Sequence, residues 1–394
     1  MMDPLSWPIQ KIQSDKKISR VNMKVWITLF ISLTTIIFVF FYIAKLLNFK
    51  SETYQAGAAV SLAMVVVLLF LFALHCYKTG IEQVNHEAWL EESLAIKNHW
   101  RNWCSQQLHI IGHQLLLPVQ NDKNKIISKS SLPVVKNQRN LFKESDFGLV
   151  TYQSILQELL FSLRGKIQRI SLHSNFDVIF IKEPDLTLWD EFSNIWTAMG
   201  LSHNLLSGHI FSDDTYATIT SRLLNEKSKN VTIIISIQLF AEKKTKDIMT
   251  ESGCIFLFAN HTKELNKDMP CCGYLYRPML SNKDSIEDNL IDMSEYQFEF
   301  KNATSIYLSG VSEEVKTQAT TALTLLTISE KLNNQYEITD LDLFLTSPGP
   351  WVALSLATLT AEKNKNTNLI ACCEQKNIIF NTVRPYVMSK GERM

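Results

Sequence analysis

Hydrophobic positions run without interruption in two stretches near the start of the chain. Residues 25–44 and 57–77 contain no charged side chain, and each is long enough to cross about 30 Å of hydrocarbon as a helix. Two such stretches in succession favour a membrane hairpin over two buried helices of a soluble core. More than twenty residues precede the first stretch, which argues against a cleaved signal peptide.

Basic residues are distributed unevenly around these two stretches. Five lysines and arginines lie before residue 25, whereas the connector 45–56 holds only Lys45 and Lys50. Because cytoplasmic flanks carry the excess of Lys and Arg, the N-terminus is expected in the cytoplasm and the hairpin returns the chain there. The seven cysteines contain no Cys-x-x-Cys spacing, which fits a reduced compartment. We therefore predict a two-pass protein of a bacterial inner membrane with both termini cytoplasmic.

Residues 86–117 carry apolar side chains mostly at three- and four-residue steps. This spacing predicts an amphipathic helix that ends before Pro118. Its apolar face packs on the core of the following domain, on a partner helix or on the membrane surface, and the pattern leaves these alternatives open. Trp89, Trp100 and Trp103 on this segment are predicted interaction residues.

The histidines His109 and His113 would share one face of this predicted helix. Two isoleucines and a glycine separate them, and no glutamate stands where a zinc metalloprotease helix places its base. We therefore predict no metal site here.

Two successive parts of the chain after residue 148 follow a similar order. Each closes with a helix, an apolar strand, a tight connection and a second apolar strand. Because these strands are too uniformly apolar to be half exposed, they predict sheets covered by helices on both faces. The predicted elements are helices 152–163, 188–199 and 213–225 with strands within 170–181, 231–240 and 252–259, then strand 304–310, helices 313–332 and 350–363, and strands 368–373 and 378–383.

The fold class predicted is therefore α/β: two N-terminal transmembrane helices followed by a duplicated α/β cytoplasmic domain. The parts expected are a cytoplasmic segment 1–24, a hairpin 25–77, an amphipathic connector 78–120, a polar linker 121–148, a first half 149–280 and a second half 281–394.

A family resemblance appears in the ends of the two halves. The phrases VTIIISIQL…ESGCIFLFA and SPGPWVALSLATLTAEK…LIACCEQKNIIFNTVRP resemble the ends of the two halves of the thiolase fold used by ketoacyl synthases. The phrases LEESLAIKNHWRNW and GYLYRPM and the helix of Trp351 resemble membrane-anchored degenerate relatives that accompany bacterial type VI secretion. Trp351 joins the predicted interaction residues, and the resemblance implies a possible homodimer that pairs across a sheet edge.

The resemblance also implies which residues a condensing enzyme needs. Ketoacyl synthases use a cysteine at a helix N-terminus, where the dipole lowers its pKa, and two histidines of the second half. Every histidine of this chain lies at or before His261, so neither histidine motif is present. Cys254 lies within an apolar strand, and Cys271 and Cys272 follow a proline. We predict no catalytic residues, no cofactor and no enzyme activity.

Composition narrows the function further. Equal numbers of acidic and basic residues, 39 each, argue against nucleic acid as a partner, and no glycine-rich phosphate motif is present. We predict a non-catalytic scaffold or docking protein whose partners are the lipid bilayer and membrane or baseplate proteins of a secretion apparatus. The alternatives are an acyl-chain-binding or acyl-transfer enzyme, acylated on Cys254 or Cys272, and a membrane immunity protein against a toxin.

Overall fold

The structure, a computed structural model, describes residues 7–9, 21–47, 50–118, 141–142, 151–183, 185–226, 228–239, 250–260, 271–329, 336–345 and 348–386. The described chain divides into two compact units: residues 9–99, and residues 100 onward together with residues up to 8. The predicted linker 121–148 lies outside the described residues except for Leu141 and Phe142. Phe142 donates its backbone N–H to Glu251 Oε2 over 2.7 Å.

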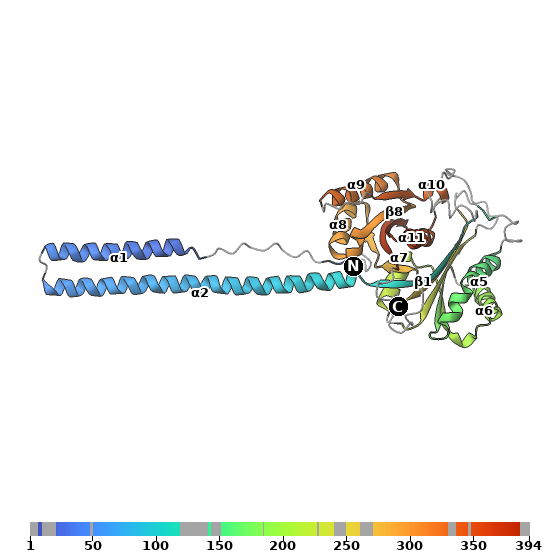
Figure 1. The fold of residues 1–394 in the computed structure, drawn as a ribbon, viewed down its shortest axis with the longest axis horizontal. Coiled ribbons are helices and arrows are strands. Elements are labelled where there is room, and N and C mark those ends of the chain that lie inside the picture. Colours follow the sequence, from blue (N-terminus) through green and yellow to red (C-terminus); the bar gives the residue numbers. More distant parts are fainter. Residues whose placement is uncertain are drawn as a thin grey trace, which may run out of the picture. The chain divides into compact units, whose positions relative to one another are not determined.

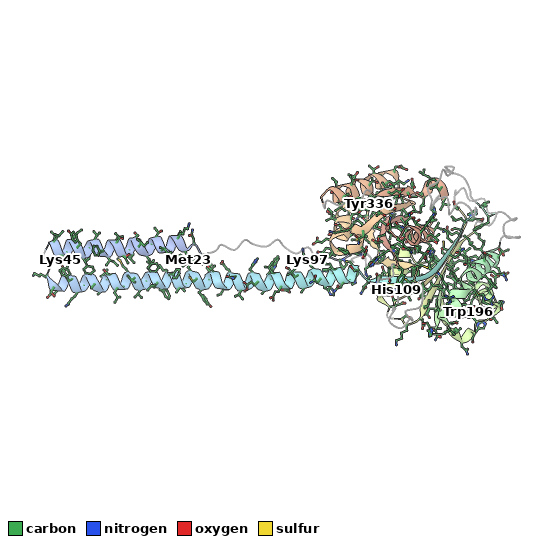
Figure 2. The ribbon with its side chains drawn as sticks, viewed as in Figure 1. Met23, Lys45, Lys97, His109, Trp196 and Tyr336 are labelled. Carbon is green, nitrogen blue, oxygen red and sulfur yellow. The ribbon has the colours of Figure 1, made fainter. Side chains whose placement is uncertain are left out.

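The first unit is a pair of helices (Figure 1). Helix α1 (Met23–Leu46) and helix α2 (Ser51–Cys104) pair through aromatic side chains, with ring centroids 5.2 Å apart for Trp26 and Phe72 and 6.4 Å apart for Phe41 and Tyr54. Both helices are long and apolar enough to cross a membrane. Their apolar side chains project outward, as Figure 2 shows for α1 between Met23 and Lys45. The prediction of two long apolar helices near the N-terminus is confirmed.

The predicted helix 86–117 is wrong in its last third. Helix α2 runs unbroken to Cys104, and the chain then forms strand β1 (Gln107–Leu116). Strand β1 pairs with β5 on one side and with β6 on the other, so sheet pairing overrides the helical spacing of a segment that also suits a strand. The connector predicted at residues 78–120 is therefore helical only to residue 104, and β1 belongs to the sheet.

The second unit contains one mixed sheet in the order β3-β2-β4-β5-β1-β6-β11-β10-β8-β9. Four strands from each half of the chain follow the same plan: the first strand is parallel to the second and third, and the third is antiparallel to the fourth. The internal repeat predicted from the sequence is thus present. These strands are β2 (Phe176–Ile181), β3 (Leu206–Ser212), β4 (Val231–Gln238) and β5 (Ser252–Ala259), then β8 (Ala303–Ser309), β9 (Glu337–Asp340), β10 (Thr367–Glu374) and β11 (Asn377–Pro385).

Two strands outside the repeat join the halves. Strand β1 continues the first half, β6 (Gly273–Tyr276) continues the second, and the two strands pair with each other. A short strand, β7 (Met279–Ser281), pairs with β11. Strand β1 thus extends the sheet of the first half, and the boundary at residue 149 stays a prediction.

Helices cover both faces of the sheet (Figure 1). Helices α5 (Tyr152–Ile170) and α6 (Leu186–Ala198) bury one face of the first half in a shared apolar cluster. Helices α7 (Tyr216–Asn225) and α11 (Pro350–Asn364) share a second cluster with strands of both halves. Helices α8 (Ile286–Tyr296) and α9 (Glu313–Ser329) pack together in the second half, and α10 (Asp342–Leu345) follows β9.

Alternation along the strands explains why both faces are covered. In β5, Cys254, Phe256 and Phe258 face the cluster around α7 and α11, whereas Ile255 and Leu257 face α5 and α6. Successive side chains of a strand point to opposite faces, so an unbroken apolar run needs a helix layer on each side. Helix α11 is buried on nearly all sides and contacts strands of both halves.

Candidate functional site

The sheet opens between its two halves where strand β6 begins, at Gly273. Strand β1 pairs with β5 as far as Leu116, but its pairing with β6 ends where Ile110 lies opposite Gly273. Cys272, just before β6, donates its backbone N–H to the Ile110 carbonyl over 2.7 Å. Gly273 is required because a Cβ there would lie 2.6 Å from the backbone oxygen of Arg384. Beyond this point a group of polar side chains lies beside β1.

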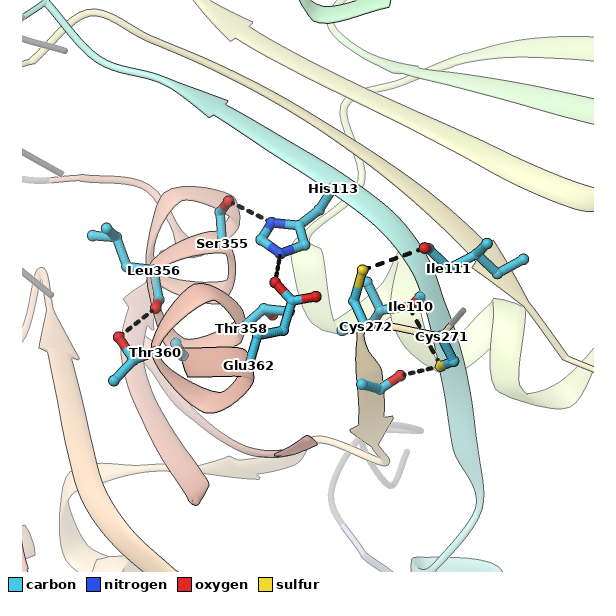
Figure 3. Close-up of polar contacts among 12 residues, drawn as sticks. Ile110, Ile111, His113, Cys271, Cys272, Ser355, Leu356, Thr358, Thr360 and Glu362 are labelled. Carbon is cyan, nitrogen blue, oxygen red and sulfur yellow. Dashed lines mark hydrogen bonds and ion pairs between the residues drawn. The ribbon is translucent and has the colours of Figure 1, made fainter. Parts of the chain in front are cut away.

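His113 connects the two halves at this opening (Figure 3). Its ring extends from β1 towards α11, where Nδ1 lies 3.1 Å from Ser355 Oγ and Nε2 lies 3.4 Å from Glu362 Oε2. Ser355 and Glu362 are seven residues apart on α11, which places them on the same helix face. His113 also stacks on Phe256, with ring centroids 5.8 Å apart. The imidazole is therefore held from three directions.

Cys272 and Lys166 complete the group, which we call the seam cluster: His113, Cys272, Glu362, Ser355 and Lys166. Lys166 Nζ lies 3.2 Å from Cys272 Sγ and donates to the Ile111 carbonyl over 3.3 Å. The lysine stem passes closely over Gly112, where an added Cβ would lie 3.0 Å from Lys166 Cδ. A larger residue at position 112 would therefore push the ammonium group away from the thiol.

The charges of the seam cluster act on one another. Burial raises the pKa of the Cys272 thiol to about 12, and Glu362 raises it as well, whereas Lys166 lowers it. Burial also raises the pKa of Glu362, but His113, Cys272 and Lys166 together outweigh burial and bring this pKa below its ordinary value. The carboxylate is thus stabilised in its charged form, and the thiol in its protonated form.

The donor atoms of His113, Cys272 and Glu362 all lie within 4.8 Å of one another. Imidazole nitrogen, thiolate sulfur and carboxylate oxygen are the ligand types that Zn²⁺ uses in proteins. These residues could hold such an ion. No sequence motif marks this group, because His113 lies 242 and 249 positions from its two partners on α11.

The N-terminus of α7 is a second meeting point of the halves. The side chain of Thr215 caps this helix by accepting from the Thr218 N–H. Glu374 Oε1, at the end of β10, accepts the Tyr216 N–H over 2.9 Å. Burial raises the pKa of Glu374, although the backbone N–H groups of Tyr216 and Ala217 act to lower it. A carboxylate thus occupies the positive end of this helix.

All seven cysteines lie in described residues, and none stands at the N-terminus of a helix that the structure describes. Cys254 and Cys372 lie within strands and are fully buried, and burial raises the pKa of both thiols above the ordinary value. Burial likewise raises the pKa of Cys271 to about 11 and that of Cys104 to about 12.

The predicted interaction residues occupy different environments. Trp351 is buried at the start of α11 against Tyr216 and Phe256, with ring centroids 4.8 and 5.7 Å away. The prediction that Trp351 lies at a contact surface is therefore wrong for this chain: it fills the core. Trp103 is half-buried, and the Arg277 guanidinium lies 4.0 Å above its ring.

Trp89 and Trp100 are half-buried on α2. The ring of Trp100 contacts that of Trp103 at 5.7 Å. Their role in binding a partner stays a prediction.

Comparison with known proteins identifies the fold. No protein-family model matches the sequence, and no curated protein sequence matches it. A chain from the complex of a type II polyketide synthase acyl-carrier protein with its ketosynthase bound to the hexaketide is similar over 72% of this chain and 100% of its own, with a TM-score of 0.51 and 11% identity. The chain has a thiolase-like α/β fold.

Other ketosynthases are similar to a lesser degree. The ketosynthase from module 6 of the bacillaene synthase of Bacillus subtilis 168 is 10% identical, with a TM-score of 0.48, over 72% of this chain and 71% of its own. The 3-oxoacyl-[acyl-carrier-protein] synthase III of Aquifex aeolicus VF5 is 12% identical, with a TM-score of 0.41, over 70% of this chain and 99% of its own. At such identities the likeness concerns the fold alone.

Proposed function

We propose that this protein is a membrane-anchored docking protein that keeps the thiolase-like fold without condensing acyl chains. The observation that carries the proposal is that no cysteine stands at the N-terminus of a described helix, and at the N-terminus of α7 Glu374 accepts the Tyr216 N–H. Condensation at a helix N-terminus needs free N–H groups and the positive end of the dipole to stabilise an oxyanion. A carboxylate bound there repels such a negative charge.

The cysteines support the same conclusion. A nucleophilic cysteine needs a lowered pKa, which a helix N-terminus or a nearby cation provides. Burial instead raises the pKa of Cys254, the residue in the apolar strand β5. Cys272 lies near Lys166, but burial and Glu362 still raise its pKa to about 12. Neither thiol is activated for attack on a thioester.

Helices α1 and α2 support anchoring in a bilayer. None of the residues in the most apolar window of α2 is buried, and 6% of those in the window of α1 are. A core helix of a soluble protein would be mostly buried, so exposed apolar helices of this length need another apolar phase. Lipid supplies that phase.

Trp7 supports a hairpin with both ends on one side. This residue is buried in the same unit as residues 100 onward, where its Nε1 donates to the Pro278 carbonyl over 2.9 Å. Its ring also meets Trp103 edge-on at 6.3 Å. A chain that crosses the membrane twice between Trp7 and Trp103 returns to its starting side. The basic residues before α1 support a cytoplasmic location for that side, and we propose that the membrane is a bacterial inner membrane.

The docking surface we propose is the part of α2 that follows the span. Its exposed apolar side chains are Ile81, Val84, Leu90 and Leu94. Apolar side chains on an isolated helix are suited to packing against a partner helix. We propose membrane or baseplate proteins of a secretion apparatus as the partners. This choice rests on the resemblance of residues 90–103 to proteins that accompany type VI secretion. Edge strand β3, exposed at residues 207–210, offers a second copy of the chain a place to pair.

Crosslinking in native membranes followed by pulldown tests the docking role. Full-length protein should recover secretion-apparatus components, and the double variant Leu90→Asp, Leu94→Asp should lose them. Leu172→Asp is the matched control, because Leu172 is 76% exposed elsewhere in the chain. Equal recovery by the double variant, or recovery of no secretion component by the wild type, contradicts the docking role.

A further inference from the structure

We propose that His113, Cys272 and Glu362 form a binding site for a divalent cation of the zinc type, which ties the two halves of the thiolase-like fold together. The three residues come from different elements: β1, the segment before β6, and α11. The site is independent of the docking role, because its test depends only on the three ligand residues.

The spacing of the donor atoms suits a tetrahedral ion. With metal–ligand bonds of about 2.0–2.3 Å, two ligands of a tetrahedral site lie about 3.3–3.8 Å apart. His113 Nε2 and Glu362 Oε2 are already 3.4 Å apart, and Cys272 Sγ lies within 4.8 Å of both. Movement of the Cys272 thiol away from the Ile111 carbonyl, to which it donates over 3.3 Å, would complete a three-ligand set.

Ser355 orients the histidine for this role. Its hydroxyl lies 3.1 Å from His113 Nδ1, so the other ring nitrogen, Nε2, faces Glu362. A metal-bound histidine carries its proton on the nitrogen that the metal does not use and commonly donates it to an oxygen. Ser355 Oγ can accept that proton as readily as it donates its own, because a hydroxyl serves in either role. The partner suits both the free and the metal-bound imidazole.

Two anionic ligands at the site can offset the charge of a dication, while the Lys166 ammonium beside them leaves the occupied site with one net positive charge. A bound ion converts the thiol to a thiolate, whose proton is released to solvent, so Cys272 and Glu362 together supply two negative charges. Lys166 Nζ, now 3.2 Å from Cys272 Sγ, can remain as a hydrogen-bond donor to the thiolate. Three protein ligands leave a fourth position for water or an added donor.

Burial favours retention of the ion. His113 and Cys272 are both buried, and Glu362 is half-buried, which leaves the carboxylate side as the route of entry. Each half of the fold contributes to the site, with His113 from the first half and Glu362 from the second. A bound ion therefore stabilises the joined halves by the free energy of its binding.

Metal content of the full-length protein in detergent micelles tests the site. The protein is stripped with a chelator, reloaded with zinc chloride, desalted and analysed by plasma mass spectrometry. Wild type should retain about one zinc per chain, and Cys272→Ser and His113→Gln should each lose at least about tenfold in affinity. Cys271→Ser is the matched control, because the neighbouring Cys271 thiol donates instead to the carbonyls of Ile110 and Gly273.

Cobalt reports thiolate ligation in the wild type itself. Co²⁺ added to the stripped wild type should produce a thiolate-to-cobalt charge-transfer band, which Cys272→Ser lacks and Cys271→Ser keeps. Glu362→Gln, at a half-buried position, should weaken zinc binding while circular dichroism stays unchanged. A wild type without zinc or the cobalt band, or variants at His113 and Cys272 that bind as tightly as wild type, overturns the proposal.

Discussion

Besides the pairing of β1 with β6, the two halves of the fold make two contacts at which a glutamate of the second half lies. Glu362 on α11 faces His113 and Lys166 in the seam cluster, and its pKa lies below the ordinary value. Glu374 on β10 faces only backbone N–H groups of α7, and its pKa lies above the ordinary value. Burial raises the pKa of both carboxyls. Hydrogen bonds from His113 and Cys272, together with nearby charge, outweigh it at the seam, whereas backbone hydrogen bonds do not outweigh it at α7.

This difference separates two kinds of joint. The seam cluster stabilises a negative charge and brings ligand atoms together, so it is suited to hold a cation. The α7 joint is mainly apolar, with Trp351 packed on Tyr216 and Phe256, and it tolerates a carboxylate at some cost. The seam cluster can bind a cation, whereas the contact at α7 is part of the apolar core.

Among the variants considered, truncation of Trp351 should lower the stability of the protein most. Trp351→Ala removes a buried aromatic ring from the α7 joint and should lower the free energy of unfolding by about 3–5 kcal/mol. Trp89→Ala, at a half-buried position on α2, should cost less than about 1 kcal/mol. Thermal unfolding of the full-length protein in detergent measures both. Similar costs for the two variants would mean that Trp351 is not a core residue.

Removal of the His113 imidazole should lower the stability less than truncation of Trp351. His113→Ala leaves the buried Ser355 hydroxyl without its partner and should cost about 2–3 kcal/mol in chelator-treated protein. His113→Gln keeps polar atoms at the position and should cost less. Chelator treatment ensures that a bound ion does not contribute. A His113→Ala variant as stable as wild type would show that the seam hydrogen bonds do not hold the halves together.

The two glutamates should give pH slopes of opposite sign. The pKa of Glu362 is lowered in the folded state, so its contribution to stability is present above the ordinary carboxyl pKa of about 4.3 and is lost as the pH falls through the folded value. Glu362→Gln should therefore reduce the acid sensitivity of the thermal midpoint. A midpoint whose acid dependence is the same in variant and wild type contradicts the charged seam.

Glu374→Gln should have the smallest effect on stability, and its pH dependence should be opposite to that of Glu362→Gln. Because the pKa of Glu374 is raised in the folded state, its contribution to stability is present below about 4.3 and is lost as the pH rises through the folded value. Glu374→Gln keeps an acceptor for the Tyr216 N–H and should remove this loss. The variant should gain stability relative to wild type between mildly acidic and neutral pH, and a relative loss over that range would contradict the assignment.

Local pattern was sufficient for much of the fold. The apolar stretches of α1 and α2, and the paired strands β4, β5, β10 and β11, follow from uninterrupted apolar runs. Strand β1 could not be predicted, because its isoleucines and leucines fit a helical period until its pairing with β5 and β6 is known. Edge strand β3 was missed as well, since most of its side chains are exposed and leave no apolar run.

The seam cluster required the tertiary structure. His113 and Cys272 lie in segments without a motif, so neither position pointed to the other. One signal was present in the sequence: Ser355 and Glu362 stand seven residues apart on a helix, with only apolar residues and two threonines between them, so they share a face that needs a polar partner. That spacing predicts a buried polar contact without naming its partner.

Mass spectrometry of the intact protein after exposure to acyl thioesters tests whether this thiolase-like fold condenses acyl chains. Full-length protein in lipid nanodiscs is incubated with acyl and malonyl thioesters, and both the protein mass and the chain length of the acyl product are measured. The account predicts an unmodified mass at all seven cysteines and no elongated product. A stoichiometric acyl adduct on Cys254 or Cys272, or an elongated chain, would contradict it.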